Sequence, residues 1–361
     1  MNIKQLSLLN YKNFDSLELE FSASINCIAG ANGIGKTTVL DAIYHLSYGK
    51  GYFNPLSTQN IKHGEELFLI EGQFEKNGST EKISCGFKKG AKKILKRNGK
   101  LYDRITEHIG LLPVVMISPS DRDLISEGSD VRRKFIDGNI SQADSTYLEN
   151  LLAYQRVLSQ RNALLKFFAA NHTFDAENLA IYDEQLHFYG SSIYEKRQAF
   201  LTEFTPLFLE QYRIISGEKE NIALEYHSGL HQKNTLELLQ ENQAKDRALQ
   251  YTSVGIHKDD LRFEIEGYPM KKFGSQGQQK SFLIALKLAQ FQFLRTQSGT
   301  TPILLLDDVF DKLDENRVAQ LVKLVKGEEY EQIFITDTHP ERTEEIVKAT
   351  GEGYKMFTLS S

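Results

Sequence analysis

The spacing of apolar residues predicts strands in two parts of the chain that lie far apart in the sequence. In both parts apolar residues alternate with polar ones or form short unbroken runs, as is typical of strands with one or two buried faces. The N-terminal set of predicted strands comprises residues 3–9, 17–21, 25–29, 67–70, 82–87 and 114–117. The C-terminal set comprises residues 261–265, 303–306 and 333–336, together with a strongly apolar helix at residues 281–294. We therefore expect one β-rich lobe assembled from residues 1–144 and 251–361.

Between these parts, apolar residues recur every three or four positions, which is helical spacing. One long helix is predicted around residues 148–168 and another around residues 182–212, with Pro206 as a kink or break. A third helix is predicted to start near Thr235, which would be its N-cap. We expect residues 145–250 to form a helical lobe inserted into the β-rich one.

A glycine-rich segment follows the predicted strand at residues 25–29 and precedes a predicted helix. It reads Gly30-Ala31-Asn32-Gly33-Ile34-Gly35-Lys36-Thr37, followed by Thr38, and matches the phosphate-binding pattern G-x-x-x-x-G-K-[ST]. The glycines let successive N–H groups point into one concavity, which the helix N-terminus closes. Lys36 can then reach the β- and γ-phosphates, and the Thr37 hydroxyl can ligate Mg²⁺. The segment predicts a nucleoside triphosphate site.

Two adjacent carboxylates follow the apolar run at residues 303–306. Asp307 and Asp308 emerge at the C-terminal end of a buried strand, where ligands of open α/β sheets bind. We expect Asp307 to hold Mg²⁺ directly or through water, and Asp308 to polarise the attacking water as general base. This pair supplies the second half of the predicted nucleotide site.

A third element lies directly before the apolar helix and reads Gly274-Ser275-Gln276-Gly277-Gln278-Gln279-Lys280. The Ser275 hydroxyl and the Gly277 N–H would lie at a helix N-terminus, which is favourable for an anion. Because the glycine-rich segment already supplies one set of N–H donors, this second set could serve a different γ-phosphate.

The distribution of positive charge along the chain indicates one candidate site of contact with nucleic acid. The 361-residue chain has a net charge of −5, which argues against a generally basic surface but not against a local one. The local candidate is a basic run that contains Lys88, Lys89, Lys92, Lys93, Lys96 and Arg97. We interpret it either as a sequence-independent contact to DNA phosphates or as a solvated hairpin tip.

Targeting and redox signals point to the cytoplasm. No apolar run is long enough to span a bilayer, and residues 1–5 lack the apolar segment of a signal peptide. The two cysteines, Cys27 and Cys85, form neither a metal-binding spacing nor a disulfide framework. We therefore expect a cytoplasmic protein without a membrane partner.

Together these motifs carry a resemblance to the head of the ATP-binding-cassette (ABC) ATPases, and the resemblance is closest to their RecF-like, SMC-related branch. The resembling stretches are residues 9–14, 30–37, 118–121, 132–137, 255–261, 275–280, 305–310, Asp311-Lys312-Leu313-Asp314 and Thr336-Asp337-Thr338-His339. The resemblance implies an α/β fold: a P-loop NTPase head, with a mixed β-sheet flanked by helices and an inserted helical subdomain. On this view residues 1–144 and 251–361 form the ATPase lobe.

The resemblance also implies a function. RecF-like proteins bind ATP and Mg²⁺, dimerise when ATP is bound, and contact the γ-phosphate in trans, here through Ser275, Gly277 and Gln278. They bind duplex DNA or gap junctions without sequence preference, work with RecO and RecR partners in DNA replication and DNA damage repair (including the SOS response), and help load the recombinase. The implied enzyme is a weak, DNA-stimulated ATPase that acts as a switch.

Several positions leave alternatives open. His339 stands where this superfamily places a switch histidine, but it could be a lone loop histidine. Lys12 and Asn13 could touch the nucleotide, or they could simply join two strands. No glutamine is evident in the loop after Ile117, where such ATPases usually have one, and Ser118 to Asp123 occupy it.

The sequence differs from the family pattern at two positions, and two other functions are possible for such a head. Lys258 stands where the family often has arginine, and Asp308 replaces the glutamate of many relatives, which suggests slow hydrolysis. The rivals share the same head: an ATPase subunit of a transporter, or the ATPase of a nuclease-linked defence system.

Overall fold

A computed structural model describes residues 1–217, 220–309, 330–348, 351 and 353–359. The chain divides into two compact units. The first comprises Met1–Arg122, Glu210–Lys219 and Gln276–Ser361, and the second comprises Asp123–Leu209 and Glu220–Ser275. The second unit thus extends beyond the predicted helical lobe at residues 145–250 on both sides. The predicted segment Asp311–Asp314 lies outside the described residues.

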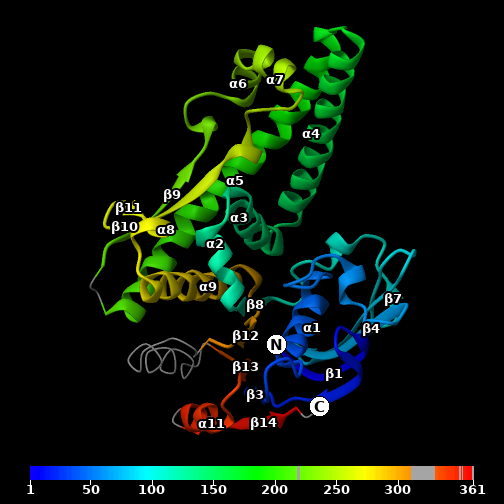
Figure 1. Ribbon diagram of the computed structural model, residues 1–361, viewed down its shortest axis with the longest axis vertical. Helices are drawn as coiled ribbons and strands as arrows, with labels where there is room; N and C mark the ends of the chain where they lie inside the picture. Colours follow the sequence, from blue (N-terminus) through cyan, green and yellow to red (C-terminus); the bar gives the residue numbers. More distant parts are fainter. Residues whose placement is uncertain (218–219, 310–329, 349–350, 352, 360–361) are drawn as a thin grey trace. The chain divides into compact units, whose positions relative to one another are not determined.

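The first unit contains a five-stranded sheet in which every pairing is parallel. Its strands, in the order in which they pair, are β14 (Tyr354–Thr358), β3 (Ile25–Ala29), β13 (Ile333–Asp337), β12 (Ile303–Asp307) and β8 (Val114–Ile117). Their labels follow one another in the reverse order down Figure 1. Every residue of β3, β8, β12 and β13 is buried, because a parallel sheet is covered on both faces.

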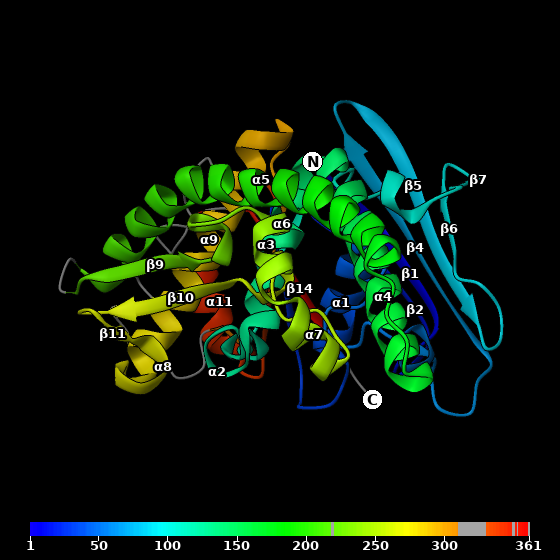
Figure 2. The same cartoon turned by 90° about the horizontal axis from the view of Figure 1, so that it is seen from above.

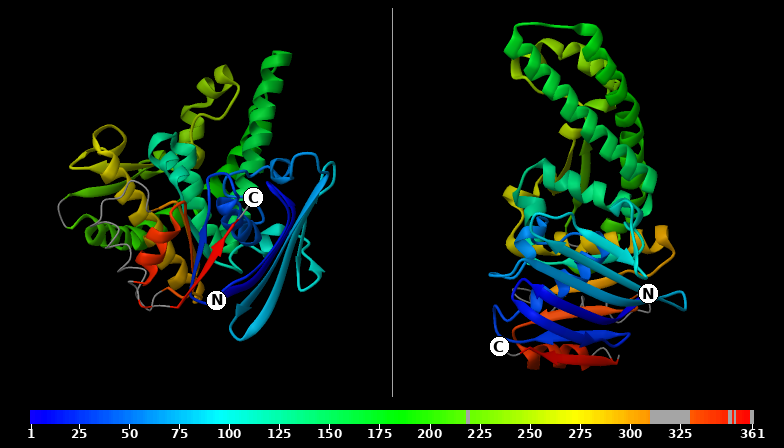
Figure 3. Two further views of the ribbon diagram at one scale, coloured as in Figure 1. Left: turned by 60° about the horizontal axis from the view of Figure 1, so that its bottom comes forward. Right: turned by 90° about the vertical axis from the view of Figure 1, so that its right-hand side faces the viewer.

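A six-stranded sheet in the same unit is antiparallel throughout. Its strands, again in pairing order, are β2 (Phe14–Glu20), β1 (Asn2–Tyr11), β4 (Leu67–Lys76), β5 (Ser79–Lys88), β6 (Ile94–Arg97) and β7 (Lys100–Leu101). The right-hand view in Figure 3 shows its blue and cyan strands side by side. Burial in β4 alternates over much of its length, so one face of the sheet packs into the core and the other is more exposed.

Helix α1 (Lys36–Tyr48) lies in the core between these two sheets. It contacts β4 and β5 of the antiparallel sheet and β8, β12 and β13 of the parallel one. Its apolar residues Val39, Leu40, Ile43 and Leu46 are fully buried. The phosphate-loop helix is therefore held on two sides by the same hydrophobic core.

The other helices of the first unit cover the parallel sheet and its loops. Helix α9 (Gln276–Ser298) contacts β8, and helix α11 (Pro340–Lys348) contacts β3. The described part of this unit also contains the short 3₁₀ helices η1 (Ser57–Asn60), η2 (Ile105–Glu107) and η3 (Pro119–Arg122).

The second unit combines helices with a small antiparallel sheet. Its helices are α2 (Asp123–Ser126), α3 (Ser129–Ala143), α4 (Ser145–Asn171), α6 (Thr235–Glu241), α7 (Gln243–Leu249), α8 (Met270–Phe273), η4 (Gly229–His231) and η5 (Ile256–Lys258). Helix α5 (Ala176–Ser216) belongs to it as far as Leu209. Its strands β9 (Ile222–His227), β10 (Asp260–Ile265) and β11 (Tyr268–Pro269) pair in that order (Figure 2).

Two of the stretches that resemble the RecF-like branch meet inside this second unit. Arg132 forms an ion pair with Asp260 at 2.7 Å, and Arg133 donates to the backbone carbonyl of Asp259 at 2.6 Å. Arg197 of α5, itself buried, pairs with Asp259 at 3.1 Å. Residues 132–137 and 255–261 therefore hold this unit together through buried and half-buried charges.

The fold class predicted from the sequence, an ABC-type ATPase head, agrees with the structure, and four details differ. Parallel and antiparallel strands lie in two separate sheets instead of one mixed sheet. Pro206 lies inside a continuous helix, so the predicted break is wrong. The third helix is capped by Asn234, not by Thr235, and ends at Glu241. The predicted helical lobe also contains β9, which pairs with β10 beyond residue 250.

None of the described helices is both long enough and apolar enough to cross a bilayer.

Candidate functional site

The glycine-rich segment forms a tight loop between β3 and α1, as its sequence predicts. Gly35, the last residue before α1, has φ = 112°, a conformation that L side chains rarely adopt. A Cβ atom at Gly35 would lie 2.5 Å from the ring of Phe14 and 2.6 Å from the amide nitrogen of Asn13. The close approach of the β1–β2 turn therefore requires glycine at this position.

The side chain of Lys36 is folded over this loop. Its Nζ atom donates to the carbonyl oxygens of Gly30 at 2.7 Å and Ala31 at 3.0 Å. The residue is buried, with 5% of its surface exposed. An ammonium group at this place, held by backbone carbonyls of the loop, can exchange them for phosphate oxygens.

The turn between β1 and β2 contacts the loop through only one of its two candidate residues. Asn13 Nδ2 donates to the carbonyl of Ile34 at 3.0 Å, and Asn13 Oδ1 accepts from the Thr38 hydroxyl at 2.8 Å. Lys12 instead forms an ion pair with the buried carboxylate of Asp41, with Nζ 2.5 Å from Oδ2. Asn13 thus shapes the phosphate loop, whereas the Lys12 amine is directed to helix α1.

The three strand ends that form the site meet at one edge of the parallel sheet. Asp307 at the end of β12 lies opposite Thr336 of β13, and Asp337 of β13 lies opposite Ala29 at the end of β3. Since parallel strands end at the same edge, Asp307 comes next to the phosphate loop although the two are far apart in sequence. Asp307 Oδ1 accepts hydrogen bonds from both the Thr37 and the Thr336 hydroxyls, each at 2.8 Å.

The environment of Asp307 suits a cation. Burial raises the pKa of Asp307 above its ordinary value, and hydrogen bonds from Thr336 and Thr37 only partly oppose this shift. A buried carboxylate beside a threonine hydroxyl is an all-oxygen donor set, which Mg²⁺ prefers. Among the described residues no group of three or more histidine, cysteine or acidic side chains could hold a metal. A metal at Asp307 and Thr37 would therefore take its other ligands from phosphate and water, as Mg²⁺ commonly does.

Asp308 is held in an unusual backbone conformation at the end of β12. Its φ is 47°, and its N–H donates to the Thr336 hydroxyl at 3.1 Å. Thr336 therefore holds the backbone of Asp308 as well as the carboxylate of Asp307, because the same hydroxyl donates to Asp307 Oδ1. Strained residues of this kind are common at active sites.

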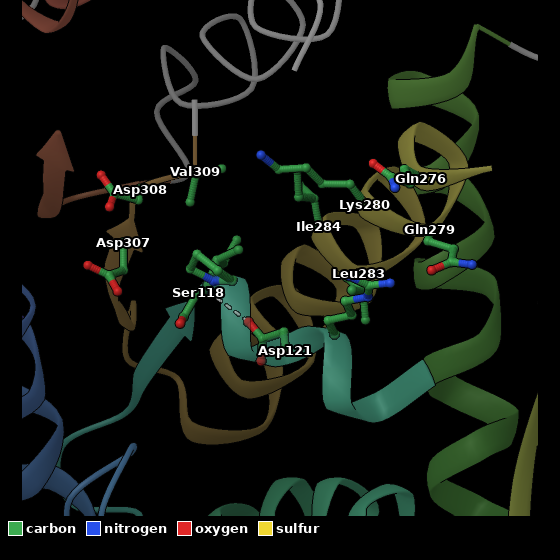
Figure 4. Close-up of a pocket in the computed structure, with 13 residues that line it drawn as sticks. Ser118, Asp121, Gln276, Gln279, Lys280, Leu283, Ile284, Asp307, Asp308 and Val309 are labelled. Carbon is green, nitrogen blue, oxygen red and sulfur yellow. Dashed lines mark hydrogen bonds between the residues drawn. The ribbon is translucent and has the colours of Figure 1, made fainter. Parts of the chain in front are cut away.

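A pocket of about 300 Å³ lies beside the two carboxylates. Figure 4 shows that its walls come from three segments: the loop after β8, the first turns of α9 and the end of β12. The first segment contributes Ser118 and Asp121, and the third contributes Asp307 and Asp308. Lys280 extends from α9 toward the end of β12 in this view.

The predicted trans element contributes to this pocket through neighbouring residues. Gln276 and Gln279 line the pocket, whereas the described lining does not include Ser275, Gly277 or Gln278. Ser275 is exposed and directly precedes helix α9, which is 23 residues long. The N-terminus of a helix of this length carries partial positive charge, which favours an anion.

His339 lies between β13 and α11, at the same edge of the sheet as the phosphate loop. Its side chain is exposed, and its backbone N–H donates to Asp337 Oδ1 at 3.0 Å. Asp337 Oδ2 in turn accepts from the Thr343 hydroxyl of α11 at 2.8 Å. This arrangement fixes the backbone of His339 and leaves its imidazole at the surface.

The basic run lies at the end of the antiparallel sheet, on β5, β6 and the turn between them. Three of its six cations are engaged: Lys89 pairs with Glu66, Arg97 pairs with Glu81, and Lys93 donates to the carbonyl of Gly49. The other three, Lys88, Lys92 and Lys96, are exposed, and their amines contact no partner among the described residues.

The structure adds residues that sequence reasoning does not assign to the site. The Thr336 hydroxyl donates to the Asp307 carboxylate and accepts from the Asp308 backbone N–H, although Thr336 enters the sequence argument only as a neighbour of His339. Asp121, which lines the pocket, forms a buried ion pair with Lys287, with Nζ 2.9 Å from Oδ1. The sequence does offer one indication of this pair: Lys287 lies within the apolar run of α9, and a lysine that is buried there needs an acidic partner.

Comparison with known proteins agrees with this geometry. The family model described as "RecF/RecN/SMC N terminal domain" matches residues 2–357. A DNA replication and repair protein RecF of Flavobacterium johnsoniae is 63% identical over 359 residues, covering 99% of this chain and 100% of that protein. The protein of the same name from Bacteroides fragilis is 47% identical, covering 100% of this chain and 97% of its own.

Solved structures lead to the same family. The recombination mediator protein RecF with ATPrS, from the RecFOR pathway, superposes with a TM-score of 0.88 at 31% identity, covering 99% of this chain and 96% of that one. An Smc head domain from Pyrococcus furiosus, with a TM-score of 0.57 at 15% identity, covers 99% of this chain and 94% of its own and shares the fold. The chain therefore belongs to the RecF/RecN/SMC N-terminal domain family and, within it, to the RecF proteins.

Proposed function

We propose that this protein is an ATP-dependent DNA-binding protein of DNA replication and recombinational repair, in which slow ATP hydrolysis acts as a release switch. The observation that carries the proposal is the meeting of Lys36, Thr37 and Asp307 at one edge of the parallel sheet. Relatives named DNA replication and repair protein RecF, and a RecF structure solved with ATP, support the same function.

In the proposed site, the phosphate loop binds ATP within one subunit. The amides of residues 30–38 and the Lys36 ammonium bind the phosphates, and the short distance from Thr37 to Asp307 allows both to hold Mg²⁺. The metal, when bound, neutralises charge that develops on the phosphates. Asn13 contributes by fixing the loop from the β1–β2 turn, and Lys12 acts on helix α1 through Asp41.

Asp308 is the proposed general base. It lines the pocket next to Asp307, where a water molecule can lie in line with the γ-phosphate. As the water oxygen bonds to the γ-phosphorus, the bond from that phosphorus to the β–γ bridging oxygen breaks and ADP leaves, while the Asp308 carboxylate accepts the proton of the water. His339, exposed at the same edge of the sheet, is the proposed sensor of the γ-phosphate. The short reach of an aspartate is consistent with slow turnover.

The second half of each site comes from a partner subunit in this proposal. Ser275, Gly277 and Gln278 lie at or next to the N-terminus of α9, and Ser275 is exposed. A helix N-terminus that is open to solvent can accept the γ-phosphate held by another copy of the chain. ATP would then join two heads, and hydrolysis would separate them.

The proposed ligand of the dimer is DNA, bound without sequence preference as duplex or at a gap junction. Lys88, Lys92 and Lys96 are exposed cations that can neutralise phosphates. The solved RecF relatives act in the RecFOR pathway, which supports RecO-like and RecR partners for this chain. A protein that acts on bacterial chromosomal DNA in this way would work in the cytoplasm. We further propose that DNA binding stimulates its ATPase activity.

Two variants test the proposal through nucleotide binding and DNA retention. Lys36→Ala should abolish binding of a fluorescent ATP analogue and ATP-dependent retention on a duplex. Asp308→Asn should bind nucleotide normally, turn over more slowly and hold DNA longer with ATP. ATP-dependent DNA retention in Lys36→Ala, or unchanged turnover in Asp308→Asn, would contradict the assignment.

A further inference from the structure

A buried group of polar side chains extends behind the pocket from Asp121, one of the residues that line it. Asp121 and Lys287 are only 4% and 7% exposed, and they form an ion pair at 2.9 Å. The Tyr52 hydroxyl donates to the same carboxylate oxygen, and Lys287 Nζ lies 3.3 Å from the Tyr52 oxygen. Burial and the nearby Asp121 raise the pKa of Tyr52 well above its usual range, so its hydroxyl keeps the proton that it donates.

The other carboxylate oxygen of Asp121 holds the loop that lines the pocket. Asp121 Oδ2 accepts from the Ser118 N–H at 2.8 Å, and the Asp121 N–H donates back to the Ser118 carbonyl at 3.0 Å. Figure 4 shows this bond, with Ser118 on the side of Asp121 that faces Asp307. The Ser118 hydroxyl is within 3.0 Å of the Ser120 hydroxyl. Ser118 is therefore fixed at the pocket by a reciprocal pair of bonds to Asp121.

Tyr52 connects this group to the phosphate-loop helix. Its backbone N–H donates to Asp41 Oδ1 at 2.5 Å, and Asp41 lies on α1 one turn after Thr37. Lys287 lies on α9, the helix headed by Gln276. One buried set of contacts thus joins α1, the loop after β8 and α9, which carry three different parts of the candidate site.

We propose that Asp121 is a positioning residue for ATP hydrolysis: clamped by Lys287 and Tyr52, it holds Ser118 in place at the pocket beside Asp307 and Asp308. This inference rests on the proposed ATPase function, and it assigns no direct contact with nucleotide to Asp121. The clamp is rigid because a buried ion pair with further hydrogen bonds has few alternative geometries. Small displacements at a reacting centre are costly, as a shift of about 1 Å can lower turnover roughly 100-fold.

Two double variants distinguish the effect of positioning Ser118 from the effects of the Asp121 and Lys287 charges and of protein stability. Asp121→Asn with Lys287→Met removes both charges but keeps an amide oxygen that can accept from the Ser118 N–H. Asp121→Leu with Lys287→Met removes the charges and that acceptor. Both replace the ion pair by neutral side chains, a change that need not destabilise a fold. We expect the first to keep kcat within about threefold of the wild type and the second to lose roughly 10-fold or more.

The dissociation constant for an ATP analogue and the thermal midpoint are measured on the same samples. Both double variants should bind the analogue within about twofold of the wild type, because Lys36 and Thr37 are intact. Ser118→Ala should lower kcat in the same direction as the Leu-containing variant. Lys4→Met, which breaks an exposed ion pair with Glu75 in the same unit, is the control and should change neither quantity.

Three results would overturn the proposal. Equal loss of kcat in both double variants would show that the charges matter instead of the bond to Ser118. Full activity in the Leu-containing variant, while it remains folded, would show that the clamp does not position the pocket. Loss of analogue binding in both double variants would place Asp121 in nucleotide binding. By contrast, a wild-type protein that binds no analogue contradicts the proposed ATPase function itself.

Discussion

Gly35 shows at the scale of a single residue how the phosphate loop depends on its neighbours. Its φ of 112° and the 2.5 Å approach of a Cβ atom to Phe14 leave room only for glycine. We predict that Gly35→Ala lowers the free energy of unfolding by about 1 kcal/mol for backbone strain, plus a further cost for the clash, and abolishes binding of an ATP analogue. Denaturant titration and analogue binding measure the two effects.

A matched control exists for this variant. Gly90 also has a positive φ, of 76°, but a Cβ atom there would meet nothing within 4 Å. Gly90→Ala should cost only the backbone strain and leave nucleotide binding intact. Equal costs for the two variants would mean that contact with the β1–β2 turn does not shape the loop.

We predict that the free energy of unfolding depends on pH through His257. It is half-buried and lies between the Tyr154 hydroxyl, 2.8 Å from Nδ1, and the Thr252 carbonyl, 3.1 Å from Nε2. Burial lowers its pKa to about 4. The unfolded chain, with an ordinary histidine pKa of about 6.5, takes up a proton between these values while the folded chain does not. Stability should therefore fall as pH drops from about 6.5 to 4, by on the order of 3 kcal/mol.

Urea titrations at pH 7 and pH 4.5 measure this loss. His257→Gln should reduce the difference between the two pH values, because the side chain no longer titrates. His63→Gln, at an exposed position, is the control and should leave the difference unchanged. An identical pH dependence in His257→Gln would exclude this histidine as the cause.

Residues with local signatures could be predicted from the sequence, and those defined by distant contacts could not. The phosphate loop is recognisable because its glycines and Lys36 stand at fixed spacing between a strand and a helix. Lys287 is visible as a charge within an apolar helix, but its partner Asp121 is brought to it only by the folded chain. The same holds for Thr336, whose role depends on its register opposite Asp307.

At the scale of elements, the β5–β6 hairpin offers a direct test of the proposed DNA contact. Replacing the exposed Lys88, Lys92 and Lys96 together by glutamate should weaken DNA binding and flatten its salt dependence. The slope should fall by roughly one unit for each lysine that contacts a phosphate. Affinity measured at several salt concentrations gives that slope.

The control changes the same number of charges elsewhere. Lys134, Lys166 and Lys245 are exposed residues of the second unit, and replacing them by glutamate gives an equal shift in net charge. This control should leave the salt slope unchanged. If both triple variants behave like the wild type, the hairpin is a solvated tip and DNA binds elsewhere.

Elements were predictable where their pattern is long and local. Helices α4 and α9 follow from apolar spacing over many residues, and the all-buried strands β3 and β12 follow from unbroken apolar runs. Strand β9 is short and its apolar pattern is weak. It pairs with β10 only because the intervening segment, which contains α6 and α7, returns the chain to its side, and the sequence pattern does not show this. Pro206 is tolerated in α5 although proline removes one helix hydrogen bond, because packing along a 41-residue helix outweighs that loss.

At the scale of the whole molecule, the proposed composite site makes a prediction about mixtures. Lys36→Ala damages the phosphate loop, and Ser275→Arg damages the element proposed to act in trans. Each variant alone should lack ATPase activity. In a mixed dimer, the intact loop of one subunit meets the intact α9 N-terminus of the other, so mixing the two proteins should restore part of the activity.

A double variant provides the control for this mixture. Lys36→Ala combined with Ser275→Arg in one chain should restore nothing when mixed with either single variant. Full activity of Ser275→Arg alone, or no recovery in the mixture, would mean that Ser275 does not complete a site on its partner.

If ATP joins two copies of this chain, its molar mass in solution should double when ATP binds. Light scattering after size exclusion should give a monomer for the wild type without nucleotide and a dimer with ATP and Mg²⁺. Asp308→Asn should form the same dimer and keep it longer, and Lys36→Ala should remain monomeric with ATP. A wild-type mass that ATP does not change, or a Lys36→Ala protein that dimerises with ATP, would show that ATP in this loop does not join two copies.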